Sequence, residues 1–252
     1  MKLNLHEFAR DGITTNDAQI QKNILLQPGY RSDVLLQFPE CKDQYPCELF
    51  LVDDVSKAAN SLMGEAEPSK QIAKIIIQKN TLAAMKMPPS DIFHNPYPFI
   101  CDTTHVQGVA AKIRFFNDCS EKLTKERVWF ANVANDSGGT NKTVNDGVYP
   151  NTLTKHLNLN GSNTWKLWVG ERQTSTASHP FHIHVNPFQL IDKNGFSYWK
   201  DTLLVSGTDN KSEKNALTVL SRYDDFDGEF VLHCHNLDHE DQGMMMNVTI
   251  AP

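Results

Sequence analysis

The chain has 252 residues, which is enough for one or two domains with hydrophobic cores, and it carries 24 basic and 30 acidic residues. The resulting net charge of −6 argues against binding to nucleic acid or to an anionic membrane. No apolar run approaches the length of a transmembrane helix, and the first residues lack the apolar segment of a secretory signal peptide.

Short apolar runs that alternate with turn residues predict an all-β fold. Before residue 80 the predicted strands are 23–26, 33–38, 48–52 and 72–78, with one short helix at 55–66. Four prolines between residues 85 and 98 predict a linker at that point. The strands predicted after the linker are 127–133, 165–169, 181–185, 188–191, 202–205, 216–220, 229–234 and 244–250.

A histidine cluster lies at the start of the predicted strand 181–185. His182 and His184 are two residues apart, so they share one face of the sheet if the segment is extended. His179 is an odd number of positions from both, which directs its imidazole to the opposite face.

A second cluster lies at the end of the predicted strand 229–234. His233 and His235 flank Cys234, so the two imidazoles point to one face and the thiol to the other. His239 and Met244 follow shortly after. The alternation therefore predicts two metal centres back to back, joined by one short piece of backbone.

The composition of the two groups indicates copper. A cysteine, two histidines and a weak axial methionine form the ligand set of a blue-copper electron-transfer site, and imidazoles also suit copper. The first group is His179, Cys234 and His239, with Met244 as the axial ligand. The second group contains only imidazoles, those of His182, His184, His233 and His235.

Structural zinc is the alternative for a cluster of cysteine and histidine residues. Zinc sites of that kind normally contain a second cysteine two to four residues from the first, and the sequence around Cys234 has none. Copper is therefore the predicted metal.

Both clusters resemble the carboxy-terminal copper motifs of the multicopper oxidases, the family of laccases, bilirubin oxidases and bacterial spore-coat laccases. Residues 239–245, His-Glu-Asp-Gln-Gly-Met-Met, are similar to the bilirubin-oxidase and spore-coat branch, which also has an axial methionine. Residues 28–34 resemble the segment Pro-Gly-Gln-Arg-x-Asp-Val of the family's middle domain. Residues 199–202 resemble the step Trp-x-Asp-Thr between the two copper motifs.

The resemblance implies a Greek-key, cupredoxin-like β-sandwich, with one complete domain preceded by part of a second. The expected division is a partial middle domain at 1–80, a linker at 81–108 and a carboxy-terminal domain with the copper motifs at 109–252. Members of the family are often exported, but the chain contains no segment that assigns a compartment.

The resemblance also implies a role for each metal-binding residue. His179, Cys234 and His239 would bind the type 1 copper with Met244 as its axial neighbour, and His182 would bind the type 2 copper. The type 3 pair would be bound by His184, His233 and His235. In the family, electrons from a small reducing substrate pass from the cysteine through the adjoining peptide to the trinuclear cluster, where dioxygen is reduced to water.

Glu240 lies directly after a predicted copper ligand and matches a carboxylate that relatives use in proton delivery. The alternative is that Glu240 is a solvated acid or a hydrogen-bond acceptor beside a ligand. With Cys234 and His239, it is a candidate catalytic residue.

The sequence departs from the family pattern in its histidines. The family's trinuclear cluster also uses two His-x-His motifs from an amino-terminal domain, and the other histidines here form no such pair: His6, His94, His105 and His156. We therefore expect a second chain or an amino-terminal domain to supply half of the cluster, and the chain to be a fragment or one half of a split enzyme.

Three functions are compatible with these features. The first is a laccase-like oxidase acting on phenols, aromatic amines, bilirubin-like pigments or low-valent metal ions. The second is a single-copper electron-transfer or copper-binding module, and the third is an inactive fragment with uncovered sheet edges.

The sequence contains four further cysteines, which could form two disulfides. Cys41 and Cys47 form one candidate disulfide, and Cys101 and Cys119 form another near the linker. Reduced thiols are the alternative for both pairs.

Overall fold

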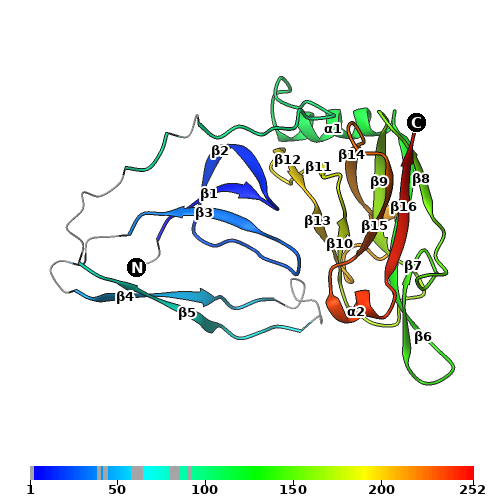
Figure 1. The fold of residues 1–252 in the computed structure, drawn as a ribbon, viewed down its shortest axis with the longest axis horizontal. Helices are drawn as coiled ribbons and strands as arrows, with labels where there is room; N and C mark the ends of the chain where they lie inside the picture. Colours follow the sequence, from blue (N-terminus) through cyan, green and yellow to red (C-terminus); the bar gives the residue numbers. More distant parts are fainter. Residues whose placement is uncertain (1–2, 39–40, 42–44, 58–64, 80–85, 90–91) are drawn as a thin grey trace.

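The computed structural model describes residues 3–38, 41, 45–57, 65–79, 86–89 and 92–252. A three-stranded antiparallel sheet with the order β2-β1-β3 comes first, made of β1 (Leu5–Arg10), β2 (Ile13–Gln21) and β3 (Ser32–Leu36). An antiparallel two-stranded ribbon of β4 (Cys47–Asp53) and β5 (Lys70–Ile77) follows it. Both lie to one side of a larger β-sandwich (Figure 1).

The strand predicted at 23–26 is wrong. β2 ends beside Leu5 and β3 begins beside Arg10, at the other end of β1, so the chain that joins them runs back along the sheet and pairs with no strand. Leu25 and Leu26 are accordingly more than half exposed. Most of the helix predicted at 55–66 lies outside the described residues, and near its ends Ser56 instead pairs with Glu67 as an isolated β-bridge.

Two sheets packed face to face form the sandwich, with helix α1 (Val109–Ser120) at one end and helix α2 (Leu237–Asp241) at the other (Figure 1). One sheet has five strands in the order β13-β10-β15-β16-β8. Its strands are β8 (Lys155–Asn158), β10 (His179–Ile183), β13 (Thr202–Val205), β15 (Gly228–Cys234) and β16 (Met245–Ala251).

The other sheet has six strands in the order β12-β11-β14-β9-β6-β7. Its strands are β6 (Thr124–Ala134), β7 (Thr140–Val144), β9 (Ser162–Val169), β11 (Phe188–Ile191), β12 (Ser197–Lys200) and β14 (Leu217–Arg222), with a short 3-10 helix η3 (Glu213–Asn215) before β14. The predicted all-β fold, a Greek-key sandwich, is confirmed. Among the described helices, none is long and apolar enough to cross a membrane.

The sandwich core lies between the two sheets. It is filled by large apolar side chains with less than 2 % of their surface exposed, among them Trp165, Phe181, Phe188, Met244 and Met246. Burying such side chains contributes about 1.5–3 kcal/mol each to folding. The core therefore supplies a rigid base for the side chains that project from the strand ends.

Helix α1 was not predicted, and its sequence explains why. Phe116 is buried and packs against Cys101 and Leu220, but Val109 and Phe115 are 46 % and 41 % exposed. The helix therefore lacks the clear apolar stripe by which an amphipathic helix is recognised in a sequence. The strands β1, β2, β7, β8 and β12 were also not predicted.

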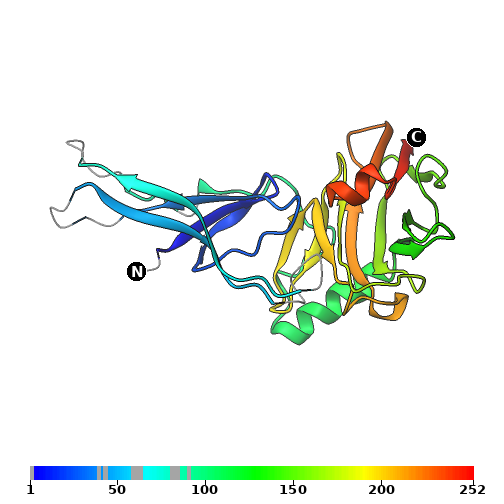
Figure 2. The same cartoon turned by 90° about the horizontal axis from the view of Figure 1, so that it is seen from below.

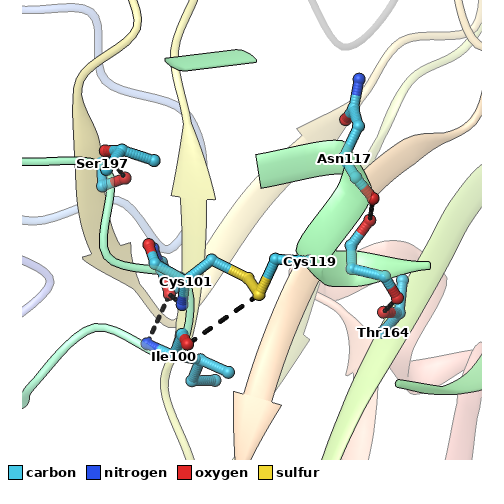
Figure 3. The surroundings of a disulfide bond; sticks show 9 residues. Ile100, Cys101, Asn117, Cys119, Thr164 and Ser197 are labelled. Atoms are coloured by element: carbon cyan, nitrogen blue, oxygen red, sulfur yellow. Dashed lines mark hydrogen bonds between the residues drawn. A yellow bond between two sulfur atoms is a disulfide. The ribbon is translucent and has the colours of Figure 1, made fainter. Parts of the chain in front are cut away.

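A disulfide joins the segment before α1 to the helix itself. Cys101 and Cys119 are bonded, with their Cα atoms 6.0 Å apart (Figure 3). The Gln189 side chain accepts hydrogen bonds from the backbone N–H groups of Ile100 and Cys101 and donates one to the carbonyl oxygen of Cys101. These contacts tie the end of the predicted linker 81–108 to β11. Cys41 and Cys47 are bonded as well.

Replacing both Cys101 and Cys119 by alanine is expected to lower the free energy of unfolding by about 3 kcal/mol, because the bond closes a loop of intermediate length. Urea titration followed by tryptophan fluorescence measures the change. The double variant Cys41→Ala/Cys47→Ala is the control, because it removes a bond outside the sandwich. An unchanged urea midpoint in the Cys101 variant would contradict the prediction.

Candidate metal centres

The pairing of β10 with β15 sorts the candidate ligands onto two faces. Phe181 lies opposite Cys234, and His182 lies opposite His233. Residues directly opposite each other in an antiparallel pair point to the same side of the sheet, and successive residues alternate. Phe181 and Cys234 are fully buried in the sandwich core, so the imidazoles of His182 and His233 point to the outer face of the five-stranded sheet.

Three of the predicted ligands lie together on the core side. Cys234 Sγ is 3.8 Å from His179 Nδ1 and 3.6 Å from His239 Nδ1, and all three residues are buried. Their donor atoms lie within 4.8 Å of one another. We call this group the mononuclear cluster.

Met244 and His239 reach the mononuclear cluster through the loop that contains α2. The Asn236 side chain caps α2 by accepting a hydrogen bond from the Asp238 N–H. The Met244 N–H then donates to the His239 carbonyl oxygen, and the Cys234 N–H donates to the Met244 carbonyl oxygen, at 3.0 and 3.1 Å. These hydrogen bonds close the loop and place Met244, whose thioether side chain is fully buried, next to Cys234.

Gln173, which the sequence did not single out, fixes the orientation of the His179 ring. Its Oε1 atom accepts hydrogen bonds from His179 Nε2 at 2.8 Å and from the Asn132 backbone N–H at 3.0 Å. Its Nε2 atom donates to the Ala177 carbonyl oxygen. With the proton of His179 held on Nε2, the lone pair of Nδ1 faces Cys234.

Four imidazoles gather on the outer face of the sheet. The ring of His182 lies 5.0, 5.2 and 5.1 Å from the rings of His184, His233 and His235. The donor atoms of the first three lie within 4.8 Å of one another, and His184 Nε2 is 3.1 Å from His233 Nε2. We call this group the imidazole cluster.

Hydrogen bonds to the Nδ1 atoms orient two rings of the imidazole cluster. His182 Nδ1 lies 2.9 Å from the Asp201 carbonyl oxygen and 3.0 Å from Thr202 Oγ1. His233 Nδ1 lies 3.2 Å from both the Cys234 carbonyl oxygen and Glu240 Oε2. Each contact holds the proton on Nδ1 and leaves the Nε2 lone pair free to bind a metal.

Burial keeps the candidate ligands in their neutral forms. It lowers the pKa of His233 and of His239 to about 4, and it lowers the pKa of His179 and His184 as well. Burial also raises the pKa of the Cys234 thiol to about 12. These four imidazoles are therefore ready to bind a metal near neutral pH, whereas binding at Cys234 must displace a proton.

The two shorter motifs of the sequence meet beside the imidazole cluster. Arg31 forms a bidentate ion pair with Asp201, with Nη1–Oδ1 and Nη2–Oδ2 distances of 3.2 and 2.5 Å. Burial alone would raise the pKa of Asp201, but hydrogen bonds from His182, Arg31 and Thr202 outweigh it and lower the pKa to about 2. The ion pair thus connects the residue just before β3 to the residue whose carbonyl oxygen orients His182.

Three further contacts from the first part of the chain support this side of the sandwich. Lys200 Nζ pairs with the buried Asp11 carboxylate at 2.9 Å and lies 3.7 Å from the centre of the Tyr30 ring. Gly29 has φ +83°, and a Cβ atom there would lie 2.6 Å from Cδ2 of His235. The turn before β3 therefore packs directly against His235 of the imidazole cluster. Figure 2 shows the first part of the chain, in blue, beside the yellow strands of the sandwich.

An open hollow of about 450 Å³ borders the imidazole cluster. His182 and His184 line it together with Asp11, Tyr97 and Asp201. His184 is exposed, so its imidazole is accessible from the hollow. The other histidines lie elsewhere: His94, His105 and His156 are exposed, and His6 is half-buried on β1.

The donor sets fit copper. The mononuclear cluster offers a thiol and two imidazoles beside a buried thioether residue, and such soft ligands select copper. The imidazole cluster offers nitrogen donors alone, which copper also accepts.

The carboxy-terminal half of the chain matches a family model described as multicopper oxidase, over residues 124–252. A multicopper oxidase of Staphylococcus aureus is 27 % identical over 118 residues, which cover 44 % of this chain and 25 % of that protein. The bilirubin oxidase of Albifimbria verrucaria is 32 % identical over 120 residues, which cover 45 % of this chain and 21 % of that protein.

Solved structures extend the similarity in fold to the whole chain. A metallo-oxidase of the multicopper oxidase type from Campylobacter jejuni superposes with a TM-score of 0.65 at 19 % identity, over 99 % of this chain and 49 % of that one. A laccase-like multicopper oxidase from Ochrobactrum gives a TM-score of 0.65 at 18 % identity, over 99 % of this chain and 51 % of that one. The chain therefore spans about half the length of these structures.

Proposed function

Because the chain belongs to the multicopper oxidase family, we propose that it forms the carboxy-terminal part of a laccase-like oxidase. The oxidase couples one-electron oxidation of a small reducing substrate to the reduction of dioxygen to water. In this proposal residues 109–252 are the cupredoxin domain with the copper motifs, 1–80 are part of a middle domain, and 81–108 link the two.

The register of β10 against β15 carries the proposal. His182 opposite His233, next to Phe181 opposite Cys234, puts an imidazole cluster and a thiol on opposite faces of the same two strands. The peptides that join Cys234 to His233 and to His235 are then the shortest covalent connections between the two clusters. An electron-accepting centre and an oxygen-reducing centre need a connection of this kind.

His179, Cys234 and His239 would hold the mononuclear copper with Met244 as the axial neighbour, and the four outer imidazoles would hold their share of a trinuclear copper cluster. Copper at the mononuclear cluster would supply one-electron oxidation of the substrate. Copper at the imidazole cluster would supply reduction of dioxygen. The protein orients the rings through Gln173, Asp201 and Thr202, whose hydrogen bonds hold each imidazole proton away from the metal side.

Glu240 is placed to hold a proton beside the imidazole cluster. Its Oε2 atom is 3.2 Å from His233 Nδ1, and its side chain is 25 % exposed, so it contacts both a cluster residue and solvent. We infer that Glu240 orients His233 and accepts or releases protons at Oε2 as dioxygen is reduced.

A second candidate function is a single-copper electron-transfer module. The observation that favours it is the number of imidazoles: the chain has ten histidines, and only His182, His184, His233 and His235 lie in the outer cluster. A complete trinuclear cluster then requires a second chain or an amino-terminal domain that supplies two His-x-His motifs.

Copper analysis combined with electron paramagnetic resonance and oxygen consumption separates the two candidates. The chain is loaded with copper in its full assembly, together with the chain or domain that supplies the two His-x-His motifs, and is offered a phenol as the reducing substrate. Several coppers per active assembly with oxygen uptake would support the oxidase, and a single blue copper without uptake would support the electron-transfer module. Bound copper without a blue signal would contradict both.

Met244→Leu is expected to retain the mononuclear copper and to raise its reduction potential. A thioether favours the oxidised ion, and the leucine side chain has no donor atom but a similar volume. Redox titration of the blue absorbance measures the shift. Met246→Leu is the matched control, because Met246 is equally buried but lies on β16 beyond the loop. Equal potentials in Met244→Leu and the unsubstituted protein would show that Met244 is not axial.

A further inference from the structure

Lys142 on β7 is buried without a carboxylate partner. Only 9 % of its surface is exposed, and its Nζ atom donates a hydrogen bond to Thr140 Oγ1 at 3.2 Å. Within the described part of the chain, no acidic side chain lies at ion-pair distance from it. Lys200, the other buried lysine among these residues, is neutralised by Asp11 at 2.9 Å. A buried charge normally has such a partner, so Lys142 requires an explanation.

The strand register places Lys142 on the side of the mononuclear cluster. Lys142 lies opposite Asn132, and Val144 lies opposite Phe130, in the antiparallel pair β6–β7. These four side chains therefore share one face of the sheet. On that face the Phe130 ring stacks on the His179 ring, with 5.7 Å between the ring centres.

A second connection runs through the backbone next to Lys142. Its cross-strand neighbour Asn132 donates a backbone hydrogen bond to Gln173 Oε1, the same atom that accepts from His179 Nε2. Lys142 is thus the cross-strand neighbour of a residue that shares its hydrogen-bond acceptor with His179. None of the residues in this chain of contacts is a charged partner for its ammonium group.

The charge of Lys142 acts on all three side chains of the mononuclear cluster. Burial is the largest cause of the low pKa of His179 and of His239, and Lys142 lowers both further. Burial raises the pKa of the Cys234 thiol, and Lys142 opposes that rise by stabilising the thiolate. Two acidic groups act in the opposite sense: Glu240 on Cys234 and Asp238 on His239.

We propose that Lys142 raises the reduction potential of the copper held by Cys234, His179 and His239. Reduction adds one electron to the site, so a positive charge nearby stabilises the reduced state more than the oxidised state. Because Lys142 is buried, solvent ions screen its charge weakly. This inference rests on the proposed function, since it assumes that the mononuclear cluster binds copper.

The test is a redox titration of the blue absorbance of the copper-loaded full chain. Lys142→Met removes the charge and keeps an unbranched side chain, whereas Lys142→Arg keeps the charge. We expect Lys142→Met to change the ratio of reduced to oxidised copper at a fixed potential about tenfold towards the oxidised form, a shift of about 59 mV for one electron. Lys142→Arg should stay close to the unsubstituted protein.

Two controls separate the field of Lys142 from other effects. Lys193→Met makes the same charge change at an exposed turn between β11 and β12, so it should leave the potential unchanged. The shift in Lys142→Met should persist at high salt, whereas a surface charge would be screened. Lys142→Gln is the second variant if Lys142→Met does not fold.

The possible failures are distinguishable. If the unsubstituted chain binds copper without a blue absorbance, the mononuclear site itself is wrong, and the inference is overturned with it. If the blue absorbance is present and the charge-removing variants keep the unsubstituted potential, the role of Lys142 is overturned while the proposed function stands.

Discussion

Cys234→Ser is expected to abolish the blue absorbance and substrate oxidation together. Serine keeps the shape of the side chain but removes the sulfur that lies 3.8 Å from His179 Nδ1 and 3.6 Å from His239 Nδ1. A hydroxyl is a poor copper ligand in place of a thiolate. The loss of activity should exceed the roughly 10–100-fold that follows removal of a hydrogen-bonding partner of a ligand.

The measurement combines the visible spectrum, copper content and oxygen consumption with a phenol, all made on the full assembly that includes the two further His-x-His motifs. Cys234 has no exposed surface, so a circular dichroism spectrum must show that the variant remains folded. Gln173→Glu offers a milder comparison, because it keeps an acceptor for His179 Nε2 and should retain the blue colour. Full oxidase activity in Cys234→Ser would mean that the mononuclear cluster is assigned wrongly.

His233→Ala should give the complementary result, with the blue absorbance kept and oxygen reduction lost. Its ring lies on the opposite face of β15 from the Cys234 thiol, 3.1 Å from His184 Nε2 and 3.2 Å from Glu240 Oε2. Removing the ring therefore takes a donor from the imidazole cluster only. Oxygen consumption should fall by more than the roughly 10–100-fold expected for loss of an outer hydrogen-bonding partner.

Parallel visible spectra and oxygen-electrode traces test this prediction. His156→Ala is the matched control, since His156 is exposed on β8 outside both clusters, and it should change neither reading. If His233→Ala lost its blue colour as the main effect, the two faces of β15 would not serve separate copper centres.

The two clusters differ in their contacts with the first part of the chain. Arg31 and Gly29 come from the first part of the chain, yet they contact Asp201 and His235 at the imidazole cluster. No residue of that part enters the mononuclear cluster as the structure describes it. The imidazole cluster is therefore the centre that depends on how the first part packs against the sandwich.

Much of the arrangement of candidate ligands follows from the sequence alone. In an extended chain the side chains alternate between two faces, a property of the backbone that needs no tertiary contact. The odd and even positions of His179, His182, His233 and Cys234 therefore determined which side chains share a face. Most core strands of the sandwich were also predicted, because their apolar runs are local signals.

The tertiary structure decided what surrounds those ligands. Gln173 orients His179, and Lys142 lies on the same side of the sandwich core, but in the sequence both are ordinary polar residues outside the predicted strands. Their roles arise from pairing between β6 and β7 and from contacts across the sandwich. The incorrect prediction of a strand at 23–26 also comes from missing tertiary information, because only the order β2-β1-β3 shows that this segment has no partner strand. Local backbone geometry assigns a side chain to a face, whereas the neighbours of that face come from strands far away in the chain, and their pairing depends on the packing of the whole core.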